Sequence, residues 1–221
     1  MVLEAQLQLH LVKYLLVGKG EMQILFATTN SHKLGEARDI LHPHNITTIG
    51  LDSLSSTFQE PIEDSDTFAG NARIKALSYA QVTGLRCMAD DSGLVVDALG
   101  GAPGVHSARF AGVGANRAER DKANNLLLLK RLQGVPNDLR TARFVCSLCI
   151  ADPDGLIVAE SEGTFEGIIA VKPEGTNGFG YDPLLYVPDA GVTSAQMLPD
   201  EKNLRSHRSA AIHSILEHLS S

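Results

Sequence analysis

The stretch ADDSGL (89–94) places two adjacent carboxylates, a hydroxyl and a glycine directly after an apolar run. Asp90 and Asp91 repel one another, and burial in a low-dielectric interior disfavours both charges. A tight turn is one interpretation, because Asp, Ser and Gly are common turn residues. A site for a divalent cation is the other, because carboxylate oxygens are ligands that such ions prefer.

A second candidate is TTNSHK (28–33), which lies where an apolar run gives way to a helical pattern. Free N–H groups at a helix N-terminus bind anions. Lys33 falls in the first helical turn, where the helix dipole disfavours a cation, and a bound phosphate would remove that conflict. An exposed lysine on a helix capped by Asn30 or Ser31 explains the segment equally well. The GxxxxGK[ST] pattern of a P-loop is absent.

Carboxylates also crowd the start of a strongly predicted helix, in EPIEDSDTFAGNARIK (60–75). Glu60, Glu63, Asp64 and Asp66 could together supply carboxylates for a divalent metal, although acidic residues at a helix start are favourable in any protein. Asn71 and Lys75 lie one helical turn apart on the edge of the apolar stripe. A solvated surface pair is the usual meaning of that spacing.

Two further segments could bind a ring. In GFGYDP (178–183), Phe179 stands between glycines and offers a face for stacking, while Asp182 can accept hydrogen bonds. In EKNLRSHRS (201–209), His207 and Arg208 crowd the positive end of a helix that Ser206 would cap. A turn with an aromatic plug is the commoner explanation of the first. Together, however, the segments supply what a nucleoside triphosphate needs: phosphate donors, metal carboxylates, an aromatic face and groups for a base edge.

These segments are positioned by alternating strand and helix patterns, so we expect an α/β fold with a mixed sheet. The 89–94 stretch would form a corner between two strands. No linker divides the chain, and we predict a single domain over 22–221 preceded by an extension, 1–21. The expected helices are 30–42, 66–84 (Asp66 as N-cap, Gly84 as stop), 116–134 and 206–219; the expected strands lie in 23–29, 46–54, 85–90, 93–99 and 141–171.

The composition of the 221 residues excludes some partners. A net charge of −7 argues against binding to long nucleic acid, which needs a broad basic surface. No run is long enough for a membrane span. Cys146 and Cys149 form a CxxC without a second pair, and their offset on a strand points them to opposite faces. Reduced, buried cysteines are therefore expected, as in a cytoplasmic protein.

The order of these motifs resembles the inosine triphosphate pyrophosphatase (Ham1-like) family, over nearly the whole chain from Met22. The resemblance is most specific in TFAGNARIKA, ADDSGLVVDALGGAPGVHSARFAG and GFGYDPLLYVP…EKNLRSHR. It implies a long, mixed, twisted sheet flanked by helices, with two lobes and a cleft between them, in a homodimer. It also implies Mg2+-dependent hydrolysis of ITP, dITP and XTP to the monophosphate and pyrophosphate.

The resemblance assigns roles to this chain's residues. Asp91 and Lys75 match catalytic positions, and Asp91, Glu63 and, less closely, Glu60 match metal positions. Matching the substrate-binding positions are Thr28, Thr29, Asn30, Ser31, His32, Lys33, Asn71, Ser92, Phe179, Gly180, Tyr181, Asp182, Lys202, His207 and Arg208.

One position departs from the family pattern, because Thr29 replaces a usual glycine. A β-branched residue does not reach positive φ cheaply, so the phosphate loop is expected to differ in detail. Three alternatives stay open at this point. They are a pyrophosphatase for pyrimidine or modified nucleotides, as in Maf-like proteins; a non-catalytic nucleotide sensor; and a zinc or redox protein built on Cys146 and Cys149.

Overall fold

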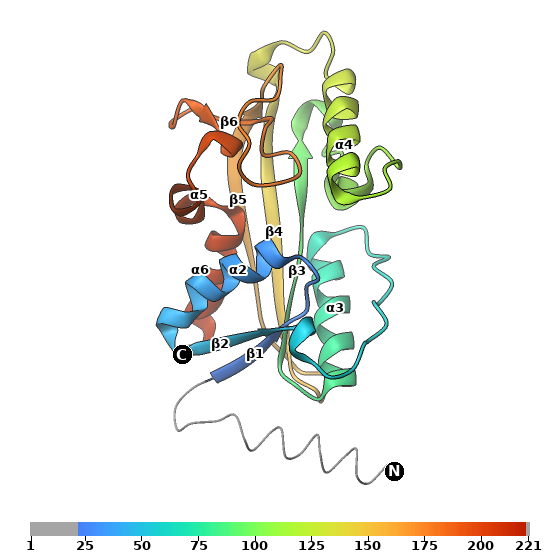
Figure 1. The fold of residues 1–221 in the computed structure, drawn as a ribbon, viewed down its shortest axis with the longest axis vertical. Coiled ribbons are helices and arrows are strands. Elements are labelled where there is room, and N and C mark those ends of the chain that lie inside the picture. The colour runs from blue at the N-terminus through green and yellow to red at the C-terminus, as the bar shows by residue number, and fades with distance from the viewer. Residues whose placement is uncertain (1–21, 220–221) are drawn as a thin grey trace.

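The computed structural model describes residues 22–219, so the predicted extension, 1–21, lies outside the described residues. The fold is built on a seven-stranded sheet in the order β2-β1-β3-β4-β5-β6-β7 (Figure 1). β1 pairs in parallel with β2 and β3, and the remaining neighbours are antiparallel. The predicted long mixed sheet is confirmed; its division into two lobes stays a prediction. The strands are β1 (Met22–Phe26), β2 (Ile46–Gly50), β3 (Cys87–Val96), β4 (Thr141–Ala151), β5 (Ile157–Ile169), β6 (Leu185–Val187) and β7 (Val192–Thr193).

Helices flank this sheet at two levels: α2, α3 and α6 surround its lower half, and α4 lies beside the upper parts of β3 and β4 (Figure 1). Within residues 22–219, no helix combines the length and apolarity that crossing a membrane requires. The helices are α2 (Ser31–Leu41), α3 (Phe68–Thr83), α4 (Arg117–Arg131), α5 (Pro199–Arg205) and α6 (His207–Leu219).

Helix ends follow the expected capping chemistry with one exception. Asn30 caps α2 by accepting from the His32 N–H, and Ser206 caps α6 by accepting from the Ser209 N–H. Gly84, at φ +68°, ends α3 in the left-handed conformation that glycine adopts without penalty. The predicted Asp66 cap of α3 is wrong: Thr67 is the N-cap, because its hydroxyl reaches the Gly70 N–H at 3.1 Å.

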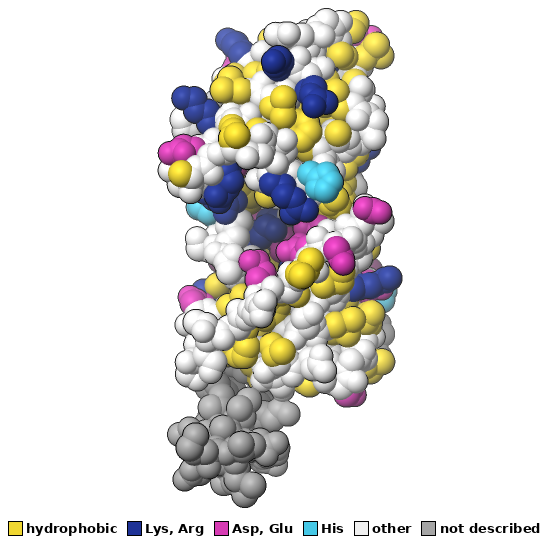
Figure 2. Space-filling model, turned by 90° about the vertical axis from the view of Figure 1, so that its right-hand side faces the viewer, with side chains coloured by type: hydrophobic (Ala, Val, Ile, Leu, Met, Phe, Trp, Pro, Cys, Tyr) yellow, Lys and Arg dark blue, Asp and Glu magenta, His cyan; other side chains and the backbone are white. Residues whose placement is uncertain are grey.

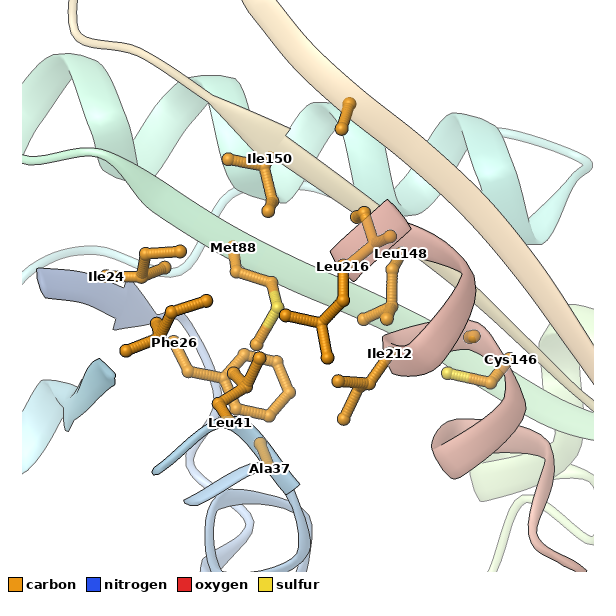
Figure 3. Packing of buried hydrophobic residues seen from close by; sticks show 14 of the residues in the cluster. Ile24, Phe26, Ala37, Leu41, Met88, Cys146, Leu148, Ile150, Ile212 and Leu216 are labelled. Atoms are coloured by element: carbon orange, nitrogen blue, oxygen red, sulfur yellow. The ribbon is translucent and has the colours of Figure 1, made fainter. Parts of the chain in front are cut away.

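The two faces of the sheet bury separate cores. Ile24, Phe26 and Met88 pack under α2 and α6, as Figure 3 shows. Neighbouring positions on the same strands, Leu25 and Cys87, pack under α3 instead. Cys146 belongs to the first core and Cys149 to the second, which confirms that they face opposite ways. A third core, under α4, fills the upper half of the molecule.

The predicted corner at 89–94 is wrong, because β3 runs without interruption from Cys87 to Val96. Its pairing with β4 keeps register through Asp90↔Leu148, Asp91↔Ser147 and Ser92↔Cys146. A strand tolerates adjacent aspartates because successive side chains point to opposite faces of the sheet. The repulsion that suggested a turn is relieved by alternation.

Strand order reverses at β1, which lies between β2 and β3. The chain leaves β1 through α2 to reach β2, and then returns through α3 to β3 on the other side. Ligands of open α/β sheets bind at such a switch point, outside the carboxyl end of the strand. β1 pairs with β3 only as far as Met88, so the edge of β3 that carries Asp90 and Asp91 is free beside the TTNSHK loop.

Candidate active site

A cavity of about 350 Å³ lies at this switch point, within the size range of small-molecule sites. Figure 2 shows a hollow at mid-height, with Lys and Arg side chains along its upper margin and Asp and Glu side chains along the lower. Most predicted site residues line it, but Ser31 and His32 do not. The lining includes Thr28, Thr29, Asn30, Lys33, Glu60, Glu63, Asn71, Lys75, Asp91, Ser92, Phe179, Gly180, Tyr181, Asp182, Lys202, His207 and Arg208.

The phosphate loop is shaped by its own side chains. Thr28 Oγ1 accepts from the Asn30 N–H at 3.2 Å, and Asn30 in turn caps α2. Among the described residues, Asn45 is the one non-glycine with positive φ. Thr29 therefore sits in ordinary backbone, exposed at the cavity, and the strain expected from replacing a glycine does not arise.

Asp90 lies on the face of β3 that packs against α2 and α6. Its carboxylate is buried and meets Lys33 Nζ at 2.9 Å and Arg208 Nη2 at 3.3 Å. Arg208 is itself buried, pairs with Glu36 and contacts Ser92 Oγ at 3.3 Å. Although burial opposes ionisation, these two cations hold the pKa of Asp90 well below its usual range. Asp90 thus ties the phosphate-loop lysine to the start of α6.

Asp91 lies on the opposite face, over α3. Asn71 Nδ2 donates to its Oδ2 at 3.1 Å, and Lys75 Nζ lies 3.7 Å from its Oδ1. Lys75 also pairs with Glu63 at 3.0 Å. Burial raises the pKa of Asp91, with Lys75 and Asn71 opposing the rise. Such a carboxyl is a better proton acceptor than a fully solvated one.

The pKa of Lys75 moves in the direction that keeps it charged. Burial alone would lower this pKa, but the carboxylates of Asp90, Asp91 and Glu63 together raise it above the usual lysine value. Lys75 is therefore a fixed cation between Asp91 and Glu63, two of the three predicted metal carboxylates. Its position suits it to stabilise negative charge on a bound phosphate.

The donor set around Asp91 suits a metal that shares its coordination with the substrate. Among residues 22–219, no three His, Cys, Asp or Glu side chains gather as a complete metal site. Mg2+ is commonly held by one or two carboxylates together with substrate phosphates and water. Asp91 and Glu63, joined through Lys75, fit that pattern, and Glu60 lines the same cavity.

The GFGYDP loop is organised by Asp182, which is buried. Its Oδ2 accepts from the Phe179 N–H at 2.7 Å and from Lys202 Nζ at 2.6 Å, and its Oδ1 accepts from Ser194 Oγ at 2.8 Å. Both oxygens are thus used within the protein. Asp182 fixes Phe179 and Lys202 in place, a contribution the sequence did not indicate.

Phe179 is surrounded by groups that suit stacking. The ring of His32 lies 5.7 Å away at an interplanar angle of 29°, and the Arg117 guanidinium lies 4.6 Å from the Phe179 centroid.

His207 stacks on Phe144, with 5.1 Å between the ring centroids. Burial, with the nearby Arg208 and Lys202 charges, holds the pKa of His207 well below its ordinary value. Its Nδ1 is buried with no partner in the protein, so a ligand could bond there.

Several contacts and residues at the cavity were not predicted from the sequence. Asp90 and Glu36 neutralise Lys33 and Arg208, and nothing in their local sequence specifies those distant partners. Arg117 and Asp121, at the start of α4, also line the cavity. Arg117 could have been found from the sequence, because, like Lys33, it is a cation in the first turn of a predicted helix, where the helix dipole is unfavourable.

Fold and site together define an α/β protein with a polyanion cleft at a topological switch point, equipped with carboxylates and a stacking residue. The Ham1 family model matches residues 24–218, and the chain belongs to this family. The dITP/XTP pyrophosphatase of Desulforamulus reducens is 46% identical over 196 residues, covering 89% of this chain and 94% of that protein. A dITP/XTP pyrophosphatase of Thermus thermophilus is 45% identical, covering 89% and 91%.

Solved structures agree with this assignment. The Staphylococcus aureus Ham1 protein superposes with a TM-score of 0.78 at 36% identity, covering 90% of this chain and 98% of that one. A HAM1 protein from Coxiella burnetii gives 0.78 at 38% identity, with the same coverage. The architecture is therefore that of Ham1 proteins.

Proposed function

We propose that this protein hydrolyses non-canonical purine nucleoside triphosphates, namely ITP, dITP and XTP, to the monophosphate and pyrophosphate, and so cleanses the nucleotide pool. The observation that carries the proposal is one cavity lined by the Lys33 loop, by the Asp91–Lys75–Glu63 cluster and by Phe179. Relatives at about 45% identity bear the name dITP/XTP pyrophosphatase.

In the proposed reaction, water attacks the α-phosphorus while the bond to the α–β bridging oxygen breaks, and pyrophosphate leaves with that oxygen. Asp91 accepts the proton of the attacking water, with Asn71 fixing its orientation. Lys75 and Lys33 stabilise the charge that develops on the phosphates. A divalent cation held by Asp91 and Glu63, with Glu60 as a further candidate, would neutralise phosphate charge and orient the water. We take this cation to be Mg2+.

We propose that hydrogen-bond donors of the protein select 6-oxo purines over adenine. Lys202 and Arg208 only donate hydrogen bonds, which suits the 6-oxo group of hypoxanthine and xanthine and opposes the 6-amino group of adenine. Ser92, Gly180 and Tyr181 complete the proposed contacts with the nucleotide. Unpaired polar groups in a closed site discriminate by roughly 10⁴-fold, so ATP should be a very poor substrate.

Two further properties are proposed for the whole protein. A cytoplasmic location is supported by three free cysteines, all buried. A homodimer is supported by large apolar side chains left exposed, among them Leu204 and Leu198 at 86% and 69%. Light scattering after gel filtration, run across a range of protein concentrations, tests the dimer.

Release of pyrophosphate from ITP, XTP, dITP, GTP, ATP and UTP, with and without Mg2+, tests the activity. We expect turnover of the first three with Mg2+ and almost none of ATP. Preference for UTP would favour the pyrimidine or modified-nucleotide alternative, and tight binding without turnover would favour a sensor. Orthophosphate plus a nucleoside diphosphate as products would contradict the proposed point of attack.

A further inference from the structure

Helix α4 reaches the stacking loop with three side chains spaced one turn apart. Asp121 Oδ2 accepts from the Gly180 N–H at 3.0 Å, and Asn125 Nδ2 donates to the Gly180 carbonyl at 3.0 Å. One turn earlier, Arg117 lies over the Phe179 ring and 3.9 Å from Asp121. Residues at i, i+4 and i+8 share one face of a helix, so this face is dedicated to the 179–180 segment.

The segment that these side chains hold is otherwise permissive. Gly178 and Gly180 flank Phe179 with φ of +75° and +63°, a region glycine enters and leaves at little energetic expense. Both polar groups of the Gly180 residue are bound by α4, and the Phe179 N–H is bound by Asp182. The backbone on either side of the stacking ring is therefore fixed by side chains from two directions.

The same helix is anchored to the protein by a different face. Leu128 is fully buried in the upper core, and Asn124 bonds the backbone of Ser107, Ala108 and Ala111. Asp121 and Asn125 are only partly buried. Their removal should leave the docking of α4 intact while releasing the loop.

We propose that Asp121 and Asn125 are positioning residues that set the place of Phe179 and hence the affinity for the base. This inference rests on the proposed function, because it assumes that Phe179 stacks on a nucleobase. It assigns no contact with substrate to either residue. The effect should thus fall on the base end of the cleft and spare the phosphate end.

The test compares Asp121→Ala and Asn125→Ala with Lys122→Ala, an exposed position on the same helix. Inhibition constants are measured for two probes, inosine monophosphate and inorganic pyrophosphate, alongside kcat and KM for ITP. Loss of one hydrogen bond should weaken inosine monophosphate binding roughly 5- to 10-fold and raise KM, while pyrophosphate binding and kcat change less than about 2-fold. Asp121→Asn, which keeps an oxygen acceptor, should recover most of the affinity.

A second measurement does not depend on catalysis. Hydrogen exchange at the Gly180 amide, followed by NMR, should accelerate in Asp121→Ala but not in Lys122→Ala. The positioning role is wrong if exchange accelerates in Asp121→Ala but inosine monophosphate binds this variant as tightly as it binds an active wild-type protein. If exchange is unchanged, or both probes weaken together, the inference is likewise overturned. Failure of wild-type protein to hydrolyse ITP would instead refute the proposed function.

Discussion

The adjacent aspartates of β3 allow the same substitution to be made on two faces of one strand. Asp90→Asn removes a buried carboxylate that Lys33 and Arg208 share at 2.9 and 3.3 Å. Asp91→Asn removes a carboxylate whose pKa burial has raised, and Lys75 keeps Glu63 as a partner. We expect the first variant to lose stability and the second to lose catalysis.

The magnitudes follow from what each change leaves behind. Breaking a buried ion pair costs about 3–5 kcal/mol, because the remaining charge is uncompensated. Arg208 retains Glu36, so about 3 kcal/mol is expected for Asp90→Asn. That loss corresponds to a fall in Tm of about 6–12 °C for a chain of this size. For Asp91→Asn we expect a stability change below about 1 kcal/mol and a fall in kcat of about 10²–10⁴-fold.

Urea denaturation followed by circular dichroism measures the first effect, and pyrophosphate release from ITP measures the second. The two variants serve as controls for each other, since they make the same chemical change at adjacent positions of one strand. Equal losses of stability would refute the opposite-face argument. Near wild-type kcat in Asp91→Asn would remove Asp91 from its catalytic role.

Three other predictions concern parts of the chain outside that pair. Gly163→Ala should lower Tm, because the added methyl group would overlap the His207 carbonyl of α6. Gly35→Ala lies in the middle of α2 with open space around it, so it should raise stability by up to about 1 kcal/mol. Equal effects of the two substitutions on Tm would contradict the close approach of β5 to α6 at Gly163. Because the pKa of His207 is depressed in the folded state, the unfolded chain alone takes up its proton as pH falls below about 6.5, and wild-type stability should fall there by up to about 1.4 kcal/mol per pH unit. His207→Gln should remove that component in denaturation curves compared at pH 7 and 5.5, and unchanged pH dependence would count against a buried neutral His207. Deleting 1–21 should leave Tm and kcat unchanged, and a large fall in Tm would mean that this segment stabilises the fold.

Local patterns were sufficient to predict most elements. The apolar periodicity of α3 and its terminal Gly84 predicted that helix to within a few residues at each end. Ser206 and Asn30 indicated helix starts, because a short polar side chain can accept a hydrogen bond from the free N–H groups in the first turn of a helix. These signals act within a few residues, so a single sequence contains them.

The long-range partners were not predictable in the same way. Asp90 and Arg208 are separated by 118 positions, and no local feature of either residue specifies the other. The same holds for Glu36, which neutralises Arg208 from α2. Without these partners in view, two adjacent carboxylates suggested a turn. β3 continues through both aspartates because Asp90 meets Lys33 and Arg208 on one face of the sheet, while Asp91 meets Lys75 on the other.

The charges gathered at the cleft set a further condition on its ligand. At the phosphate end of the cleft, the ion-paired groups comprise three cations and four carboxylates, namely Lys33, Lys75, Arg208, Glu36, Glu63, Asp90 and Asp91. Every one of these cations is already within 4 Å of a carboxylate. A triphosphate entering this cluster therefore meets no excess of positive charge.

Binding of the triphosphate should consequently depend on added cations, and not only its turnover. We expect removal of divalent metal by a chelator to weaken binding of a non-hydrolysable ITP analogue at least 10-fold in calorimetry, because phosphate charge would then face Asp91 and Glu63 directly. Glu63→Gln, which removes one of those carboxylates, should reduce that metal dependence while retaining the side chain's shape. Metal-independent binding of the analogue to wild-type protein would mean that Lys33 and Lys75 leave their carboxylates to meet the phosphates, and that the charge balance of the free cleft does not govern affinity.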